Sequence, residues 1–573
     1  MPLNLFLREH EKRNVSEWTY HVEDKSVSSK MLYPFWKKVA SIVPKTVAPN
    51  VLSLAGFICI LHAYYVVTVL NSSYPAVASL LAAVLVFAYQ TLDAIDGIHA
   101  RRTMNESSIG ELFDHACDNV GMPFLVITVA RCLGYTNNVC IWFVVQSVQL
   151  VLMKSHFKAF IDSERFVRYR VVGSPGDALI IVEIVLIARS MLGLDWLFTM
   201  YLHLLHLLSD LTEYILHQIG FTEFHAPHEQ VTEEQLWLWG PKVIYYGLLL
   251  WFIARVLLTK KQLKFNDPIT GEAIGEQVDT YPTKTALLLC LGYRAIPSLL
   301  LWVPGATPVT LFVSELDIIC DGVLMSILTS DLILSKMARR NVHSWVPILY
   351  MLSIFDRLVC LVLVAVYFGG VFGDLCTYMN LPLLTTNVNV YCDGVYDLCH
   401  CGHKNLFKAA LRFGTRLLVG VVGDEDANKY KRPPIMTCDE RAAEVAGCKG
   451  VHTVIKDSPC FGLTEEFIKK HMIHVVAHGK EYTALDQAEE YRKEMEKALE
   501  KGDLEGAKEL RKKAAFEQKK GDINPKALSE RGEKYYKVAF DMGISEILPR
   551  TPGLSTSDLI RRCQEAGTKR HDK

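Results

Sequence analysis

Long apolar runs dominate the first two thirds of this chain of 573 residues. They lie near residues 48–70, 75–92, 119–134, 137–153, 177–194, 195–208, 237–258, 284–303, 309–334 and 345–372. A helix needs about 20 apolar residues to cross a bilayer, so the shorter runs must include flanking residues. The pattern predicts a polytopic α-helical membrane domain with about ten spans over residues 48–372.

Charge is distributed unevenly along the chain. The formal net charge is −1, which indicates no nucleic acid partner. Residues 404–573 are rich in Lys, Arg, Glu and Asp, whereas residues 48–372 are mostly apolar. This asymmetry predicts a membrane part followed by a soluble part. The fifteen cysteines are scattered rather than arranged as a framework of pairs, and we interpret them as reduced thiols.

The last third has the pattern of alternating strands and helices. The segments "NVNVYCDGVYD", "RLLVGVVGDED" and "IHVVAHG" are typical of buried strands, and helix-like segments separate them. This alternation predicts a parallel α/β sheet in residues 387–573. Residues 485–530 interrupt it as a charged helical insertion at the surface. Residues 373–386 are predicted to be a linker, and residues 1–47 a cytosolic or interfacial segment.

Two carboxylates lie where the second apolar run ends. Asp93, Asp96, Gly97, Ala100 and Arg101 are spaced 0, 3, 4, 7 and 8, so they share one stripe of an α-helix. Gly97 and Ala100 leave space on that stripe for a ligand, and Arg101 can pair with a phosphate. The basic end of this helix is predicted to lie on the cytosolic side.

A second stripe follows at once. Gly110, Asp114 and Asp118 are spaced 0, 4 and 8, again on one helical face. Facing stripes would bring four carboxylates together, and such like charges repel unless a cation lies between them. Oxygen-only ligands suit Mg²⁺, Mn²⁺ or Ca²⁺. The alternative is an acidic loop that faces water, but ionisable groups on two matching stripes at a membrane boundary favour a functional site.

These eight positions match the signature of the CDP-alcohol phosphatidyltransferase family in residue type and spacing. The segments "APNVLSLAGF", "FAYQTLDAIDG", "ARRT" and "GELFDH" resemble more narrowly the eukaryotic choline/ethanolamine phosphotransferases. The resemblance covers roughly residues 30–370. It implies that the four aspartates hold Mg²⁺ or Mn²⁺ and that Gly97, Ala100, Arg101 and Gly110 contact the CDP-alcohol. A diacylglycerol hydroxyl then attacks the β-phosphate and CMP leaves.

The resemblance leaves the base for the acceptor hydroxyl open. Asp118, last on its stripe, is one candidate, and His156 in "SHFKAF" is the other. His156 matches a histidine of the relatives, whereas the glutamates expected beside it are absent. Asp177 stands where relatives often have a glutamate. A further acidic set in a later apolar run has no assigned role: Glu315, Asp317, Asp321 and Asp331.

The soluble part carries His400 and His403 on either side of Gly402, after a strand and at the start of a helix. Free N–H groups at a helix N-terminus and two imidazoles suit nucleotide phosphates. A zinc site is the alternative, because cysteines lie close by, but the ligand spacing does not fit the usual pairs. The sequence therefore favours phosphate binding.

Several further motifs resemble the cytidylyltransferases that activate phosphocholine or phosphoethanolamine. His400 and His403 match that family's HxGH motif, and the resemblance covers about residues 387–484 and 531–565. It implies a Rossmann-like nucleotidyltransferase fold in which a phosphomonoester attacks the α-phosphate of CTP, and in which His400, His403 and Lys431 stabilise the developing charge. The other CTP-binding residues that it implies are Arg441, Arg550, Thr551, Gly553, Ser555, Thr556 and Ser557.

The amino alcohol is expected to contact Asp393, Tyr482 and Tyr536, since a carboxylate and aromatic faces can hold a cationic head group. A tryptophan that phosphocholine enzymes usually add is absent from "SPCFGLTEEF". The incomplete cage favours phosphoethanolamine slightly, and phosphocholine stays open.

Together the two resemblances predict one chain that makes a CDP-amino alcohol and consumes it. Its product is phosphatidylethanolamine or phosphatidylcholine, and its linkage raises the local concentration of the intermediate. The families imply a multi-pass protein of the endoplasmic reticulum or Golgi, with both sites cytosolic, and a homodimer. The rival hypothesis is an inactive membrane anchor that tethers a cytidylyltransferase.

Overall fold

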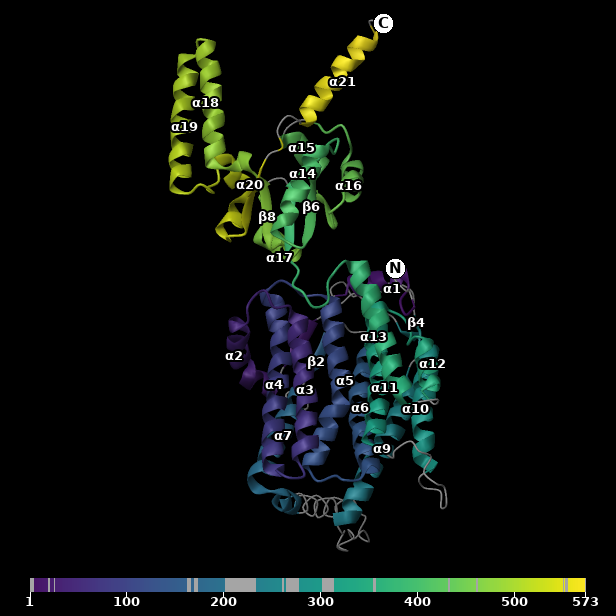
Figure 1. Cartoon of the computed structure of the whole chain (residues 1–573). Coiled ribbons are helices and arrows are strands. Elements are labelled where there is room, and N and C mark those ends of the chain that lie inside the picture. The colour runs from purple at the N-terminus through teal and green to yellow at the C-terminus, as the bar shows by residue number, and fades with distance from the viewer. Residues whose placement is uncertain are drawn as a thin grey trace, which may run out of the picture. The chain divides into compact units, whose positions relative to one another are not determined.

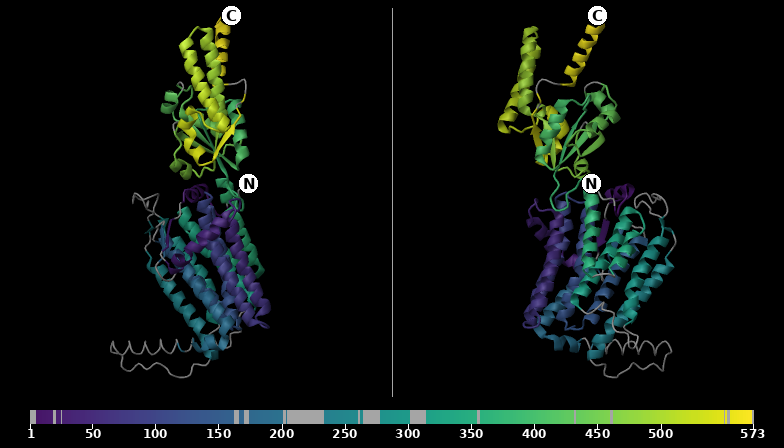
Figure 2. Two further views of the ribbon diagram at one scale, coloured as in Figure 1. Left: turned by 90° about the vertical axis from the view of Figure 1, so that its left-hand side faces the viewer. Right: turned by 45° about the vertical axis from the view of Figure 1, so that its right-hand side comes forward.

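The computed structural model divides into two compact units, Met1–Thr385 and Thr386–Lys573. It describes residues 5–18, 21–24, 26–161, 166–169, 174–200, 203, 233–259, 262–263, 278–300, 314–353, 357–430, 433–459, 462–549, 551 and 555–571. Figure 1 and Figure 2 show the first unit as a bundle of long helices and the second as a sheet surrounded by helices. Each unit is described by itself below.

The first unit consists mainly of helices that lie side by side. Their bounds are α1 Glu9–Ser16, α2 Val27–Ile42, α3 Pro49–Leu70, α4 Pro75–Arg102, α5 Ser108–Cys132, α6 Asn138–Ile161, α7 Pro175–Leu192, α9 Glu233–Leu258, α10 Tyr281–Leu300, α11 Glu315–Ala338, α12 Trp345–Leu352 and α13 Arg357–Met379. Four short strands accompany them: β1 His21–Asp24 pairs with β2 Phe166–Tyr169, and β3 Gln262–Leu263 pairs with β4 Val278–Asp279.

Six helices in the described part of the chain are long and apolar enough to cross a membrane. They are α3, α4, α6, α11 and most of α9 and α13. The prediction of a polytopic helical membrane domain is thus confirmed, whereas the number of about ten spans is not. Half of the predicted span 195–208 lies outside the described residues. The predicted span 345–372 is wrong as a single helix, because α12 ends at Leu352 and α13 starts at Arg357.

Two other expected segments differ from the structure. Helix α13 continues to Met379, so the first half of the expected linker 373–386 is helical. In the N-terminal segment, Phe6, Leu7 and Val15 are buried in the main hydrophobic core of the unit. The N-terminal residues therefore pack into the bundle, while α2 keeps exposed apolar side chains beside the buried Trp36.

Among the described helices of the first unit, α11 is the most enclosed. Every residue from Ile318 to Ala338 is buried. A Cβ atom on Gly322 would lie 2.6 Å from Cγ of Pro123 in α5, so only glycine permits this close approach. Helix α11 contacts α5, α6 and α13.

The acidic residues without an assigned role in the sequence have structural partners here. Glu315 accepts hydrogen bonds from Tyr64 and forms an ion pair with Arg131. Asp317 caps the start of α11, and Asp321 accepts a hydrogen bond from Trp142 Nε1 at 2.6 Å.

Asp331 lies deepest in this network. It forms a 2.7 Å ion pair with Arg340 and accepts hydrogen bonds from the Tyr367 hydroxyl at 2.9 Å and the His343 backbone N–H at 2.7 Å. These contacts join α11, α13 and the loop between α11 and α12.

The second unit contains a five-stranded parallel sheet. Its strands are β5 Asn389–Gly394, β6 Arg416–Val422, β7 Thr453–Ser458, β8 Val475–Gly479 and β9 Ser545–Leu548, in the order β7-β6-β5-β8-β9. Its helices are α14 Cys401–Ala410, α15 Asp424–Tyr430, α16 Cys438–Ala446, α17 Glu465–Lys470, α18 Ala484–Glu500, α19 Leu504–Ile523, α20 Glu530–Asp541 and α21 Thr556–His571. The predicted parallel α/β domain is confirmed.

The charged insertion forms a helical hairpin. Helices α18 and α19 lie against each other and project from the sheet of the second unit (Figure 1). Strands β5, β6 and β8 coincide with the three predicted strand segments, whereas β7 and β9 were not predicted. Most side chains of β7 are exposed or half-buried, so the segment lacks the apolar pattern of a central strand.

We expect Arg340→Met to destabilise the first unit by about 3 kcal/mol, because it leaves the Asp331 carboxylate buried without its cation. Thermal unfolding of the protein in detergent measures the change. The double variant Arg340→Met/Asp331→Leu removes both charges and should recover part of the loss. Equal stability of Arg340→Met and the parent protein would contradict a role for this ion pair.

Candidate functional site

The first candidate site lies where the last turns of α4 face the first turns of α5. Ser107 caps α5 and accepts a hydrogen bond from the Gly110 N–H at 3.0 Å, which fixes where the helix starts. A capped start sets which residues of the following turns face inward. Asp114 and Asp118 lie one and two turns beyond Gly110, opposite the acidic stripe of α4.

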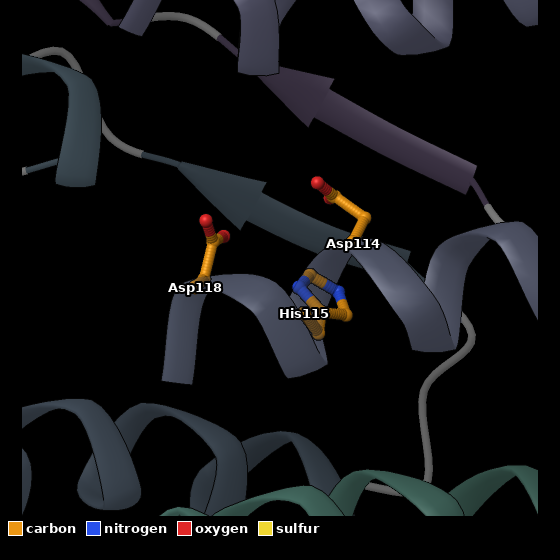
Figure 3. A group of neighbouring side chains, drawn as sticks. All are labelled: Asp114, His115 and Asp118. Carbon is orange, nitrogen blue, oxygen red and sulfur yellow. The ribbon is translucent and has the colours of Figure 1, made fainter. Parts of the chain in front are cut away.

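The structure brings all four predicted aspartates together. Asp93 lies within electrostatic reach of Asp96 and Asp118, and Asp114 within reach of the other three. Ligand atoms of Asp114, His115 and Asp118 lie within 4.8 Å of one another. In Figure 3 the two carboxylates rise from the same stretch of α5, with the His115 ring between them. The predicted acidic cluster is therefore formed by the tertiary structure.

Two hydroxyl groups orient this cluster. Tyr89 in α4 donates a hydrogen bond to Asp118 Oδ1 at 2.7 Å, and Ser53 in α3 donates one to Asp96 Oδ2. Sequence reasoning missed both residues. Tyr89 lies one turn before Asp93, so helical spacing could have pointed to it, but Ser53 comes from another helix.

The cluster fits a divalent cation. Four carboxylates share few donors at the interface of two helices, so their repulsion needs a positive charge between them. Carboxylate oxygens favour Mg²⁺ or Mn²⁺, and His115 adds a nitrogen that Mn²⁺ also accepts. The residues present therefore fit the metal ion that the sequence pattern predicts, and the choice of ion is left to experiment.

Arg101 and the small residues border the same site. A Cβ atom on Gly97 would lie 3.6 Å from an Arg101 guanidinium nitrogen, so this guanidinium extends back along α4 towards the aspartates. Within the described residues Arg101 makes no ion pair or hydrogen bond through its side chain. Ala100 lies on the same stripe, and a Cβ atom on Gly110 would lie 3.2 Å from Asn50 Oδ1. Because the Arg101 side chain has no such partner among the described residues, its guanidinium is available to a phosphate group.

Two further residues of the first unit were singled out in the sequence, His156 and Asp177, and only His156 borders the acidic site. His156 in α6 contacts His115 edge-on, with ring centroids 5.7 Å apart, so it borders the site through that ring. Asp177 caps α7 through Ser174 and accepts a hydrogen bond from the Ser28 N–H at 2.9 Å. Asp177 therefore has a structural role in this structure.

The second candidate site lies at the carboxyl ends of β5 and β8. All strands are parallel, but the direction in which successive strands are added to the sheet reverses between β5 and β8, and such a switch point is where open α/β sheets bind ligands. Asp393 is the second-last residue of β5, and its Oδ1 accepts a hydrogen bond from the Tyr536 hydroxyl at 2.8 Å. The three predicted amino-alcohol residues meet here, since the Tyr482 and Tyr536 rings lie 5.1 Å apart.

His478 in β8 completes this aromatic group, and no pattern in the sequence pointed to it. Its ring stacks on Tyr536 at 4.7 Å, and its Nε2 lies 2.8 Å from the Ser545 hydroxyl. Burial raises the pKa of Asp393 to about 6, against the opposing effect of the Tyr536 hydrogen bond. Asp393 is therefore ionised above about pH 6, which leaves a buried negative charge suited to a cationic group.

His400 and His403 lie at the start of α14. His400 is the N-cap, and its Nδ1 accepts a hydrogen bond from the Gly402 N–H at 3.1 Å. Burial lowers the pKa of His400, so the ring is neutral at pH 7 and carries its proton on Nε2. That Nε2 lies 3.5 Å from the Thr556 hydroxyl, and the two histidine rings stack at 3.9 Å.

The cysteines near these histidines point to other partners. Cys392 Sγ accepts a hydrogen bond from the Tyr396 hydroxyl, and Cys399 Sγ lies 3.7 Å from Cys448 Sγ. These contacts do not assemble the ligands of a zinc site. No disulfide joins any of the cysteines in the described part of the chain.

Arg441 is fully buried, with 0% of its surface exposed. Its guanidinium donates hydrogen bonds to the carbonyl oxygens of Val395 at 2.6 Å and Met436 at 3.1 Å, and pairs with Asp424 at 2.5 Å. It therefore connects the loop after β5 with the segment before α16. Asp397 reinforces this connection by accepting hydrogen bonds from two N–H groups of the same segment.

Helix α21 starts among the last of the predicted CTP-binding residues, at Thr556. Ser555 and Asp558 cap this helix reciprocally, and the Thr556 hydroxyl donates to the Asp397 carbonyl oxygen at 3.3 Å. Thr556 thereby lies beside His400, another of the residues predicted to bind CTP. Thr551 is half-buried and Ser557 is exposed. Three predicted residues lie outside the described residues: Lys431, Arg550 and Gly553.

Comparison with known families agrees with these two sites. Residues 46–211 match the CDP-alcohol phosphatidyltransferase family, and residues 391–562 match the cytidylyltransferase-like family. Both resemblances predicted from the sequence are confirmed. The matched ranges contain every residue of the two candidate sites.

Curated relatives match the same two regions. Choline/ethanolaminephosphotransferase 1 of Saccharomyces cerevisiae is 34% identical over 143 residues, which cover 24% of this chain and 37% of that protein. Choline-phosphate cytidylyltransferase 2 of Arabidopsis thaliana is 33% identical over 177 residues, covering 30% and 44%. Ethanolamine-phosphate cytidylyltransferase of Arabidopsis thaliana is 41% identical over 96 residues, covering 16% and 23%. The chain thus spans less than half the length of each of these relatives.

We expect Tyr89→Phe to weaken Mn²⁺ binding about tenfold, because Asp118 loses the hydrogen bond that orients it. Metal titration of the purified protein in detergent measures this affinity. Tyr65→Phe is the control, since Tyr65 is an exposed tyrosine of α3. Unchanged Mn²⁺ affinity in Tyr89→Phe would contradict the orienting role.

Proposed function

We propose that this chain catalyses two consecutive steps of phospholipid synthesis. The second unit condenses CTP with a phospho-amino alcohol and releases pyrophosphate. The first unit transfers the phospho-amino alcohol from the resulting CDP-alcohol to diacylglycerol and releases CMP. The observation that carries this proposal is the assembled set of four aspartates on α4 and α5, in one chain with the His400–His403 helix start.

In the first unit the aspartates hold Mg²⁺ or Mn²⁺, which when bound neutralises the CDP-alcohol diphosphate. The Arg101 guanidinium pairs with a phosphate oxygen, and Gly97, Ala100 and Gly110 leave space for the substrate. The acceptor hydroxyl attacks the β-phosphate while a base removes its proton. Asp118 and His156 are the two candidates, and His156 borders the site through His115.

In the second unit we infer a Rossmann-like nucleotidyltransferase. The order β7-β6-β5-β8-β9 supports this fold, because it has the central reversal of doubly wound sheets. The Nε2 proton of His400, His403, Lys431, Thr556 and the N-terminus of α14 stabilise charge on the CTP phosphates. Arg550, Thr551, Gly553, Ser555 and Ser557 complete the CTP site, and Arg441 positions it by holding the adjoining segments.

The head group is proposed to be ethanolamine. Asp393 offers a buried carboxylate to the ammonium, and a primary ammonium can donate a hydrogen bond that a quaternary one cannot. The Arg531 guanidinium already lies 5.5 Å from the Tyr482 ring centre, so this aromatic face is shared with a cation of the protein. A complete choline cage needs free aromatic faces.

The protein is a multi-pass membrane protein, and we propose that it resides in the endoplasmic reticulum or Golgi. Basic clusters after α9 and α11, such as Lys336 to Arg340, support a cytosolic location for this end of the bundle. Both active sites would then face the cytosol, which supplies CTP to the second unit. Diacylglycerol would enter from the bilayer.

An inactive membrane anchor is the alternative function for the first unit. An anchor has no need for four converging carboxylates, whose repulsion lowers stability. The assembled cluster and the family match of residues 46–211 favour an active transferase.

Asp114→Asn tests the proposal. Purified protein receives CTP, diacylglycerol, Mg²⁺ and radiolabelled phosphoethanolamine, or phosphocholine in a separate reaction. We expect lipid product to fall roughly 100-fold or more, because charge stabilisation by the metal is lost, while CDP-alcohol forms at the parent rate. Phosphocholine should give less product than phosphoethanolamine.

Glu106→Gln is the matched control, since Glu106 is an exposed acid of the loop between α4 and α5. Lipid synthesis that persists in Asp114→Asn would contradict the assigned role of the aspartates. CDP-alcohol without lipid in the parent protein, with Mn²⁺ or varied acceptors, would favour the anchor.

Asp393→Asn tests the amine site. We expect the KM for phosphoethanolamine to rise roughly tenfold at pH 7, because a charge-assisted hydrogen bond is lost. The parent enzyme should bind this substrate less well as pH falls through about 6, where Asp393 becomes protonated.

The phosphate of phosphoethanolamine also titrates in this pH range. Asp393→Asn therefore serves as the reference that shows the pH dependence of the substrate alone. Asp393→Asn should keep only the substrate's own pH dependence, and Asp541→Asn, an exposed acid of α20, should behave as the parent. Identical pH profiles of the parent enzyme and Asp393→Asn would rule out Asp393 as the amine ligand.

A further inference from the structure

Three cationic side chains line a hollow between α6 and α9 that has no part in either candidate site. The hollow has a volume of about 250 Å³ and is lined by Lys154, Phe157, Lys158, Trp251, Phe252 and Arg255. Its lining contains three cations, three aromatic rings and no carboxylate. We call it the cationic hollow.

The cationic hollow lies near the same end of the bundle as the four aspartates. Lys154 and Lys158 are two residues before and after His156, whose ring contacts His115 in the acidic site. At 100° per residue, both lysines point to the face of α6 opposite His156. Helix α6 therefore separates the acidic site from the cationic hollow at one level of the bundle.

The positive charges of the cationic hollow are not neutralised within the described part of the chain. Lys154, Lys158 and Arg255 make no ion pair with any described carboxylate, and all three side chains are exposed. Lys154 and Lys158 are four residues apart, so their like charges face each other on the helix surface. Lys154 Nζ lies 4.6 Å from the Trp251 ring centre. An anion would relieve this repulsion.

The surroundings of the cationic hollow are those of a lipid-facing surface. Phe157 and Phe252 are buried and meet edge-on with centroids 5.5 Å apart, which forms the floor. Trp251 is 45% exposed, and Leu250, Leu257 and Val151 are exposed on the same two helices. Tryptophan and long basic side chains beside apolar surface are typical of the membrane–water interface. An occupant therefore has apolar chains as well as a negative charge.

We propose that the cationic hollow binds the phosphate headgroup of an anionic glycerophospholipid in the adjoining leaflet. Lys154, Lys158 and Arg255 surround the phosphate, Trp251 packs beside the glycerol region, and the acyl chains lie along the exposed leucines. A basic pocket between membrane helices at an interface has the chemistry for such headgroups. The bound lipid lies one helix away from His156 and contacts none of the catalytic residues.

Phosphatidylglycerol is the probe, added to the purified full chain in detergent, and native mass spectrometry counts the retained lipid. We expect Lys154→Gln/Lys158→Gln/Arg255→Gln to bind it roughly tenfold or more weakly, because each basic residue near the surface contributes to binding. Binding to the parent protein should weaken with added salt. Phosphatidylcholine, which has no net charge, should be retained weakly by both proteins.

The matched control removes three exposed lysines of α2 as Lys30→Gln/Lys37→Gln/Lys38→Gln. The double variant Lys154→Gln/Lys158→Gln covers the case in which the triple variant unfolds, and it should show an intermediate loss. Equal retention of phosphatidylglycerol by the triple variant and the control would overturn the proposal. It would mean that Lys154, Lys158 and Arg255 contact water rather than a lipid headgroup. Equal retention of phosphatidylcholine by the parent, or full competition by equimolar glycerol 3-phosphate, would also overturn it.

Discussion

A polar group inside a helical membrane bundle has little access to water, so it must find its partners within the protein. Helix α11 meets this requirement almost completely. Asp331 is neutralised by Arg340 and accepts hydrogen bonds from Ser335, Tyr367 and the His343 N–H, and Asp321 accepts one from Trp142. The acidic residues of α11 hold neighbouring helices together because each has a donor of its own.

The four aspartates of α4 and α5 break this pattern. Tyr89 and Ser53 donate one hydrogen bond each, which leaves most of the carboxylate oxygens to repel one another. The same constraint that makes α11 a structural helix therefore marks the α4–α5 interface as the candidate functional site. A cluster of this kind fits a divalent cation, and its position beside Arg101 suits a phosphorylated substrate.

The acidic site depends on packing far from it. Trp18 in the N-terminal segment donates a hydrogen bond to Glu111 in the first turn of α5, and Lys336 of α11 lies over the Trp18 ring. Gly322 allows α11 to approach Pro123 of α5. In the second unit, Arg441 has a comparable role, since a single buried guanidinium holds together segments that border the proposed CTP site.

Local patterns in the sequence determined much of this protein. The helical spacing of Asp93, Asp96, Asp114 and Asp118 predicted the acidic cluster, and apolar runs predicted the long helices and strands β5, β6 and β8. These features depend on residues within two or three turns of one another, so periodicity reveals them. Only the tertiary structure decided that Ser53 orients Asp96, that His478 stacks on Tyr536, and that Lys154 and Arg255 line one hollow. Such contacts join separate elements, and their geometry depends on how side chains pack between helices and strands rather than on any repeat in the chain.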